Sequence, residues 1–488
     1  MRKVLKNLEK YDVYKLFGVL PILSAVGNSG HVLYKLFGFL PIFLIKYRET
    51  RKLIYLFGIL LLKIKKNFNQ NNKLPTNNNN MPPEVSIHLQ DTKNPVGRVM
   101  LVFHMDFLRK DCGCSNYVYE TARLLKKQGY AIDFFSADLW GTAVFDKFVE
   151  LNKREKLIDN FYFSNYKKAE GYTASDEVCL ADINWINGFI RNFFEKLMIK
   201  NKYDYIYIHY IQWADLLKNR ANLFPETKAV YNCQDSNFNQ KFLNTKGDLS
   251  IKSRIVADAF EYELRSFDLF DKILCISYDE MLFWKKFLPD REFYFVPHPL
   301  KEIKHDKSEK NIDLLYLAAY NPYNLHGLEW FVDKVLPFIT NKINITVCGK
   351  LVQFLKSNDP EYIKKLEILG FNLIDFADDL NELYSKVKAA IVPLYEGTGM
   401  KIKTIEAMSH NIPIVSRLPG VDGFPDKTNS GILVTDNPKL FADNIMHLLT
   451  DEDFYKSVKE QEHEYFNKLF DKKHVQNVMK EVFVVSEK

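Results

Sequence analysis

Several patterns that assign a function directly are missing from this sequence. It contains no Cys-x-x-Cys pair and no histidine cluster at zinc-ligand spacing, so its six cysteines do not indicate a structural zinc site. Cys112-Gly-Cys114 is interpreted as part of a loop, with a redox or metal element as the alternative. The first predicted strand is followed by no Gly-x-Gly-x-x-Gly fingerprint, and no nucleophile-elbow motif or strand-end Asp-x-Asp is found. We therefore expect no obligatory metal, no cofactor and no serine nucleophile.

Long hydrophobic runs are missing as well. The longest uncharged run, residues 16–34, is interrupted by Pro21, Gly27 and Gly30 and by polar residues. A helix that spans a membrane needs about 20 apolar residues. No signal peptide with a small-residue cleavage site is found either. Cys275 and Cys348 fall in predicted strands, as reduced thiols of a cytosolic protein do, and we expect a cytoplasmic protein.

The chain is long enough for more than one core. With 488 residues, of which 47% are hydrophobic, two or three domains are expected. The net charge of +6 is unevenly spread, because residues 1–66 hold 13 Lys and Arg against 3 Asp and Glu. This segment therefore carries +10 and the remainder −4. Such a basic segment indicates an anionic surface as its partner, and we expect no nucleic-acid partner.

Residues 1–66 consist of a repeated, basic, amphipathic unit. Tyr-Lys-Leu-Phe-Gly starts at Tyr14 and Tyr34, and Tyr-Leu-Phe-Gly starts at Tyr55, so that the Phe-Gly pairs are 20 residues apart. Short apolar runs with tyrosine and basic residues at their edges suit the membrane interface. The alternative is a helical subdomain that packs on the rest of the chain or on another copy of itself. Residues 67–97 begin with an Asn-rich tract and are predicted to be a linker.

From residue 98 onward, predicted strands and helices alternate. A strand at 99–103 leads through a loop to a helix at 115–128 and a strand at 131–135, which form a β-α-β unit. A second series of the same kind starts at residue 312. Further strands are predicted at residues 205–208, 229–231, 272–276, 294–296, 343–348, 372–375 and 389–394. The pattern predicts an α/β protein with two doubly wound, Rossmann-like domains.

The predicted boundaries give two halves and a tail. The first half covers residues 98–300, and the second covers residues 301–450. Residues 451–488 are predicted to form amphipathic helices that can return to the first half. In doubly wound sheets, ligands bind at the carboxyl ends of the strands. Loops at such ends carry His104, His209, Asn321 and Gly397.

One segment of the second half carries the densest functional pattern. Gly397 and Gly399 follow a predicted buried strand and let the backbone turn tightly against a ligand. The helix that begins near Lys401 offers unpaired backbone N–H groups and a partial positive charge, which suit a phosphate. Lys401 and Lys403 add cations, and Glu406 lies on nearly the same helix face, where it can accept hydrogen bonds from sugar hydroxyls. The alternative is an ordinary surface helix after a glycine turn.

This segment resembles the donor-binding signature of GT-B glycosyltransferases, in the large retaining family that uses nucleotide sugars. That family commonly has Gly-x-Gly-x-Lys/Arg-x-Lys-x-x-Glu-Ala-Met, followed by a Gly-x-Pro-Val-Val strand. Residues 397–415 are similar, with His-Asn before the proline. The resemblance is strong over residues 389–423 and weak over residues 98–450. It implies the GT-B architecture, in which two Rossmann-like domains face each other across a cleft.

The resemblance also implies roles for the matched residues. Glu406 matches the glutamate that holds the nucleotide ribose. Gly399 and Met400 match the loop whose backbone faces the diphosphate, and Lys401 and Lys403 match its basic side chains.

One position departs from the family pattern. Many members carry a second glutamate near the transferred sugar, and this chain has Thr398 there, whereas Glu396 stands close by but out of register. The predicted donor-binding residues are Asn321, Glu396, Gly397, Thr398, Gly399, Met400 and Lys401. The predicted catalytic residues are His209, Lys403 and Glu406.

Three histidines and an aspartate complete the candidates. In the resembled family, a histidine in a strand-end loop comparable to that of His209 often meets the donor sugar, and the alternative is a structural histidine. His104 is a similar candidate. Asp235 either touches substrate or forms a turn, and His298, between two prolines, is assigned to the hinge.

These features lead to a functional hypothesis. We predict a metal-independent, hexosyltransferase-like enzyme that moves a sugar from a nucleotide-sugar donor to a glycan or lipid-linked acceptor, and the resemblance implies retention of configuration. The Lys-Leu-Phe-Gly repeats resemble those of bacterial surface-polysaccharide transferases, which implies cell-surface polysaccharide synthesis on the inner face of the membrane. Because the same fold hosts sugar-nucleotide 2-epimerases, an epimerase is the enzymatic alternative. A non-catalytic GT-B scaffold module is the other.

Overall fold

The structure is a computed structural model, which divides into an N-terminal unit that ends at Pro82 and a larger unit that begins at Pro83. In the larger unit it describes residues 83–110, 112–137, 142–165, 186–244, 249–305, 309–397 and 399–484. In the N-terminal unit it describes the backbone of six strands between residues 12 and 65. Thr398 lies outside the described residues.

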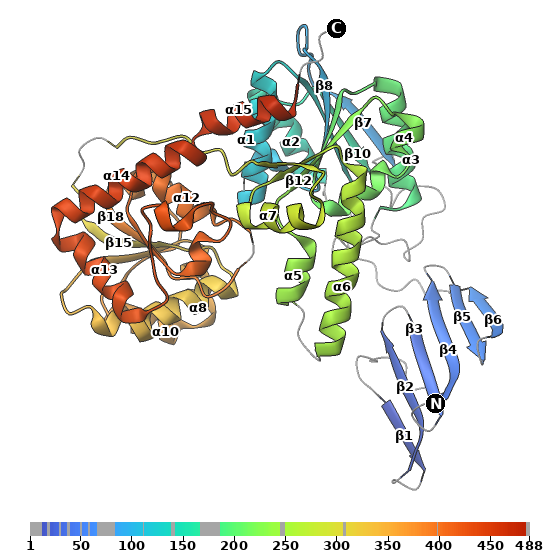
Figure 1. Cartoon of the computed structure of the whole chain (residues 1–488), viewed down its shortest axis with the longest axis horizontal. Coiled ribbons are helices and arrows are strands. Elements are labelled where there is room, and N and C mark those ends of the chain that lie inside the picture. The colour runs from blue at the N-terminus through green and yellow to red at the C-terminus, as the bar shows by residue number, and fades with distance from the viewer. Residues whose placement is uncertain are drawn as a thin grey trace. The chain divides into compact units, whose positions relative to one another are not determined.

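The N-terminal unit contains an antiparallel sheet in which each strand pairs with the next along the chain (Figure 1). Its strands are β1 (Asp12–Leu16), β2 (Leu20–Asn28), β3 (His31–Leu36), β4 (Leu40–Arg48), β5 (Arg51–Leu56) and β6 (Ile59–Lys65). One copy of the 20-residue repeat corresponds to one pair of strands. The register shifts after Tyr14, Tyr34 and Ile54, which is the same place in each copy. The repeat is therefore built from strands, and the alternative of a helical subdomain is wrong for the described residues.

The first half of the larger unit is organised around an eight-stranded sheet with the order β14-β13-β12-β11-β8-β9-β10-β7. Its strands are β7 (Glu84–His88), β8 (Arg98–Val102), β9 (Ala131–Ala137), β10 (Asn160–Ser164), β11 (Tyr205–His209), β12 (Lys228–Cys233), β13 (Lys272–Cys275) and β14 (Glu292–Phe295). All pairs are parallel except the pair of β7 with β10. Every residue of β9 and of β11 is buried, as expected for parallel strands covered on both faces.

Two features of this half differ from the predicted elements. β7 lies inside the range that was predicted to be a linker, and it forms the edge of the sheet. The sequence also predicts a helix at residues 261–270, of which residues 261–266 belong to the longer helix α6 (Leu249–Ser266) and residues 267–269 form a 3-10 turn. The other helices of this half are α1 (Gly113–Lys127), α2 (Thr142–Glu155), α3 (Gly188–Asn201), α4 (Arg220–Leu223), α5 (Asn237–Asn244) and α7 (Tyr278–Phe287).

The second half contains a parallel six-stranded sheet with the order β17-β16-β15-β18-β19-β20. Its strands are β15 (Ile312–Leu317), β16 (Ile345–Cys348), β17 (Asn372–Ile374), β18 (Val387–Val392), β19 (Ile414–Ser416) and β20 (Leu433–Val434). Its helices are α8 (Pro322–Trp330), α9 (Lys350–Asn358), α10 (Pro360–Ile368), α11 (Leu380–Ser385), α12 (Ile402–Ser409) and α13 (Pro438–Thr450). β18 begins two residues before its predicted start because α11 ends at Ser385. The prediction of two doubly wound parallel sheets is confirmed.

Two further helices, α14 (Glu452–Leu469) and α15 (Lys472–Val482), end the chain. Past the end of α15, the Phe483 carbonyl accepts a hydrogen bond from the Tyr130 hydroxyl, with 3.0 Å between the oxygens. The Val482 carbonyl accepts one from Lys272 Nζ, also at 3.0 Å. Tyr130 and Lys272 belong to the first half, so the predicted return of the tail is confirmed. No described helix is both long and apolar enough to cross a membrane.

Candidate functional site

The glycine loop between β18 and α12 turns as the sequence predicts. Gly397 has φ 151° and Gly399 has φ 65°, in the left-handed region that favours glycine. A Cβ atom on Gly399 would lie 2.5 Å from Oδ1 of Asp235, which follows β12 of the first half. The loop therefore depends on glycine for its backbone conformation and for its close approach to Asp235. Met400, by contrast, is buried in the core of the second half.

Lys401 is the N-cap residue of α12 and is almost fully buried. Its Nζ donates a hydrogen bond to the Gly399 carbonyl at 3.0 Å, which closes the loop. Burial lowers the pKa of Lys401, and this effect is partly offset by the acidic groups of Asp422, Asp235 and Glu280. Lys401 thus places a cation between the glycine loop and carboxylates of the first half.

Lys403 reaches from α12 to α8. Its Nζ donates to the Asn324 side-chain oxygen at 2.5 Å and lies 5.0 Å from the centre of the Tyr316 ring. Burial, together with the nearby charge of Lys401, lowers the pKa of Lys403 to about 7. This amine is therefore poised to change its charge near neutral pH.

Glu406 lies on the same helix, three residues after Lys403. Burial raises the pKa of its carboxyl group to about 7. Its carboxylate has no hydrogen bond or ion pair to any residue within the described ranges, although the neighbouring lysine has a partner in Asn324. A partly buried carboxylate of this kind can accept hydrogen bonds from ligand hydroxyls.

Asn321 and Asn324 start helix α8 after strand β15. The Asn321 side chain accepts a hydrogen bond from the Asn324 backbone N–H at 2.8 Å, so Asn321 caps the helix. Asn324 itself is buried, and its side-chain amide donates to the Ala319 carbonyl at 2.7 Å. Sequence reasoning selected Asn321 and missed Asn324. The cap spacing was a signal for the helix start, but the contact with Lys403 is tertiary.

Glu396 is the remaining predicted loop residue that the structure describes. Its side chain is exposed. Its neighbour Tyr395 lies under the Arg417 guanidinium, which is 5.0 Å from the ring centre.

The histidine predicted to orient the sugar is a core residue in this structure. His209 is the last residue of β11 and is fully buried, with its Nδ1 3.0 Å from Nε2 of Gln234. Burial lowers its pKa to about 3, so its imidazole is neutral. His104 is half-buried, and its ring lies 5.1 Å from that of Tyr210. His298 is buried against Tyr117.

Two buried glutamates that the sequence did not suggest hold the loop that bears Asp235. Glu263 accepts hydrogen bonds from the Ser236 hydroxyl at 3.0 Å and from the Phe238 N–H at 3.1 Å. Glu280 accepts one from the Ser236 N–H at 3.3 Å. Burial raises the pKa of Glu263 to about 7 and that of Glu280 to about 8. They lie on α6 and α7, so their convergence on this loop depends on the fold.

A second contact joins the two halves close to the signature. The carboxylate of Asp279, on α7, accepts hydrogen bonds from the Gly423 N–H at 2.8 Å and from Lys427 Nζ at 2.6 Å. The Gly423 carbonyl accepts one from the Tyr278 N–H at 2.8 Å. Loops at the carboxyl ends of both sheets therefore meet at Gly399 and again at Gly423.

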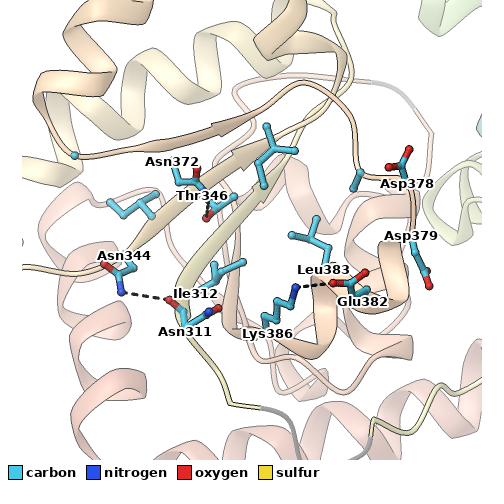
Figure 2. Close-up of a pocket in the computed structure, with 14 residues that line it drawn as sticks. Asn311, Ile312, Asn344, Thr346, Asn372, Asp378, Asp379, Glu382, Leu383 and Lys386 are labelled. Carbon is cyan, nitrogen blue, oxygen red and sulfur yellow. Dashed lines mark hydrogen bonds and ion pairs between the residues drawn. The ribbon is translucent and has the colours of Figure 1, made fainter.

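A separate pocket of about 610 Å³ lies in the second half (Figure 2). It is lined by residues at the amino ends of β15 and β16, among them Ile312 and Ile345, and by Asp379 and Glu382 near α11. Lys386, at its rim, forms an ion pair with Glu382 at 2.7 Å. The glycine loop and α12 follow the carboxyl end of β18, so this pocket is distinct from the predicted donor site.

Comparisons with known proteins agree with this architecture. Residues 311–451 match the family described as Glycosyl transferases group 1. A Klebsiella pneumoniae protein described as an uncharacterized 44.6 kDa protein in the cps region is 26% identical over 270 residues, which are 53% of this chain and 68% of that protein.

Two solved structures show the same fold. Sucrose-phosphate synthase from Thermosynechococcus elongatus aligns with a TM-score of 0.58 and 11% identity, over 79% of this chain and 98% of that one. Anabaena Alr3699/HepE, solved in complex with UDP and glucose, aligns with a TM-score of 0.54 and 10% identity, over 79% and 99% of the two chains. The predicted GT-B fold of two parallel-sheet domains is thereby confirmed.

Proposed function

We propose that the protein is a glycosyltransferase that takes its sugar from a nucleotide-sugar donor. The observation that carries the proposal is the composition of α12 and the loop before it. Lys401 is the N-cap of a short helix that carries Lys403 and Glu406, and this helix follows two glycines in the left-handed region. The Glu406 carboxylate has no hydrogen bond or ion pair among the described residues, whereas Lys401 and Lys403 each donate a hydrogen bond. The family match of residues 311–451 supports the same conclusion.

The donor would bind at the carboxyl ends of the second sheet. The backbone from Gly397 to Met400 and the N-terminus of α12 would face the diphosphate, with Lys401 and Lys403 neutralising its charge. Glu406 would accept hydrogen bonds from the ribose hydroxyls. We assign Glu396, Thr398 and Asn321 to the surroundings of the donor rather than to the chemistry.

The first half would supply the acceptor side. His209 is buried behind Gln234, so we assign it the orientation of the loop that carries Asp235 instead of direct contact with the sugar. Transfer would proceed with retention of configuration, as the family resemblance implies. It would need no obligatory metal, because the lysines and the helix N-terminus stabilise the leaving diphosphate.

The relatives support a biological setting. The Klebsiella relative is described as a protein of the cps region, and the Anabaena neighbour was solved with UDP and glucose. We propose that this chain uses a UDP-sugar or a related donor to build a cell-surface polysaccharide on a glycan or lipid-linked acceptor. It would act in the cytoplasm, with its basic N-terminal unit on the inner face of the membrane.

A panel of nucleotide sugars tests the proposal. A donor should raise the unfolding temperature of the wild-type protein, and Glu406→Ala should lose this stabilisation and nearly all transfer while keeping its fold. Glu367→Ala, an exposed position on α10, is the matched control and should behave as wild type. Full turnover by Glu406→Ala would contradict the assignment.

The same assay separates the alternatives. Donor conversion that needs no acceptor would indicate the epimerase. No stabilisation by any donor would indicate the scaffold module.

A further inference from the structure

A pair of cysteines lies beside the proposed donor site. Cys112 is the N-cap residue of α1, and Cys114 is in the first turn of that helix. Their sulfur atoms are 3.0 Å apart, and both residues are partly exposed. The other described cysteines, Cys233, Cys275 and Cys348, are buried. The pair is thus the accessible dithiol of the described part of the chain.

The two thiols differ in acidity. The two sulfurs share a hydrogen bond in which either can be the donor, and this contact with Cys114 lowers the pKa of Cys112 to about 5. The same hydrogen bond and burial raise the pKa of Cys114. Cys112 is therefore the thiol of the pair that more readily forms a thiolate, and Cys114 is a neighbouring thiol that can resolve an oxidised form.

Gly113, the residue between the two cysteines, contacts helix α12. A Cβ atom on Gly113 would lie 2.3 Å from Cδ1 of Ile402, the first residue of α12. The start of α1 and the start of α12 are therefore packed closely against each other. A shift of the Cys112–Cys114 backbone would be transmitted to the helix that carries Lys403 and Glu406.

A strained residue completes this surface. Tyr210 follows β11 with φ 72°, a value that is uncommon for a residue other than glycine. Its hydroxyl is near enough to Cys114 to affect the acidity of that thiol. Such strain persists where the surroundings hold it, often at functional sites. The Tyr210 ring packs edge-on against His104 at 5.1 Å.

We propose that Cys112 and Cys114 form a reversible disulfide on exposure to peroxide, and that this bond regulates the protein by disturbing the start of α12. The sulfurs of a disulfide lie about 2.0 Å apart, so the pair must approach by only about 1 Å. Disulfides that form in the cytosol are generally transient and regulatory. The effect on catalysis rests on the proposed function, whereas the disulfide and its effect on α12 do not.

The redox step balances with hydrogen peroxide as the oxidant. The Cys112 thiolate attacks one peroxide oxygen, the O–O bond breaks, and a sulfenic acid and hydroxide form. The hydroxide takes up a proton and becomes water. The Cys114 thiol then attacks the Cys112 sulfur, loses its proton and displaces a second water as the S–S bond forms. Two thiols are oxidised by two electrons, and one peroxide is reduced to two waters.

The first test detects the bond itself. Full-length protein is treated with peroxide, alkylated with N-ethylmaleimide and digested with trypsin, which releases both cysteines in the peptide 111–123. The proposal predicts that most of this peptide carries no adduct, is lighter than the dithiol by two hydrogen atoms, and takes up two adducts if dithiothreitol precedes alkylation. A peptide that carries two adducts after peroxide treatment would overturn the proposal.

The second test measures the coupling to α12 without any donor. Hydrogen exchange of residues 399–409 is compared before and after oxidation, in wild type and in Cys114→Ser, which cannot form the bond. Faster exchange in oxidised wild type that dithiothreitol reverses, and that Cys114→Ser lacks, supports the coupling. A disulfide that leaves this exchange unchanged would overturn it.

Donor-induced thermal stabilisation is then compared in the reduced and oxidised forms. If a disulfide forms and α12 responds but no donor binds either form, the redox inference stands and the proposed function fails.

Discussion

At the scale of single residues, α12 carries Lys403, which loses its positive charge above neutral pH, and Glu406, which loses its negative charge below neutral pH. The pKa of Lys403 is lowered to about 7 and that of Glu406 is raised to about 7, and burial is the main cause in both. The ammonium form that holds a diphosphate is lost as pH rises through 7. The carboxylate form that holds ribose hydroxyls is lost as pH falls through 7.

Affinity for a nucleotide sugar should therefore be highest near pH 7 and fall on both sides. In Lys403→Met, the affinity should no longer fall on the alkaline side but should still fall on the acid side. Binding at pH 7 should also be weaker by about tenfold or more, which corresponds to the loss of a charge-assisted hydrogen bond.

Isothermal titration calorimetry from about pH 5 to 9 measures this pH dependence of the affinity, because the diphosphate of a nucleotide sugar does not titrate in that range. Lys364→Met, on the exposed face of α10, should keep both limbs. An unchanged bell-shaped profile in Lys403→Met would refute the charge assignment.

Gly399 needs glycine for its positive φ and for its close approach to Asp235, whereas Gly370 needs it only for its positive φ. Gly399 and Gly370 both have positive φ, but a Cβ atom on Gly370 would meet nothing within 4 Å, whereas one on Gly399 would meet Asp235. Alanine at either position should cost about 1–2 kcal/mol in the free energy of unfolding through backbone strain. Only Gly399→Ala should also weaken donor binding, because its loop must withdraw from Asp235.

Chemical denaturation and donor titration of the two variants measure these effects. Adding Asp235→Ala to Gly399→Ala should recover part of the lost stability by removing the clash. Equal donor affinity in Gly399→Ala and Gly370→Ala would mean that the approach of the loop to Asp235 is not needed for binding.

At the scale of elements, the sequence predicts the central strands well and the edges poorly. β11 and β15 are short apolar runs between turn residues, which is the pattern of a buried parallel strand. β7 follows an Asn-rich tract and pairs only at the sheet edge, so its own residues give little signal. Apolar runs of about ten residues fit a strand or a helix equally by periodicity, which explains why the N-terminal repeat was recognised but its strands were not.

The same limit applies to the candidate site. Lys401, Lys403 and Glu406 lie within six residues of one another, so the spacing on one helix was enough to find them. Asn324, Glu263 and Glu280 act through contacts with distant segments. The sequence holds no local pattern for such contacts.

Helix α15 follows the second half in the sequence but should stabilise the first half, with which the end of the helix makes contact. Met479 is fully buried, whereas the adjacent Lys480 is exposed. Met479→Ala should lower the free energy of unfolding by about 2–5 kcal/mol, the usual cost of emptying a core position. Lys480→Ala should change it by less than about 0.5 kcal/mol. Denaturant titration followed by tryptophan fluorescence compares the pair, and equal effects would mean that α15 is not docked in solution.

At the scale of the whole molecule, the uneven charge separates an attachment function from a catalytic one. Residues 1–66 carry +10 and the rest of the chain −4, so binding to a membrane surface should depend on the N-terminal unit alone. The full chain should sediment with vesicles that contain phosphatidylserine or phosphatidylglycerol, and added salt should release it in part, because screening weakens the attraction of the basic residues. The variant that lacks residues 1–82, cut at the boundary between the two units, should stay in the supernatant and still be stabilised by donor.

A full-length variant with its N-terminal lysines changed to glutamine controls for the loss of mass, and it should bind vesicles weakly although its repeats are otherwise intact. Sedimentation of the truncated chain would place the attachment in the larger unit, and undiminished binding of the glutamine variant would assign it to the apolar repeats instead of to charge.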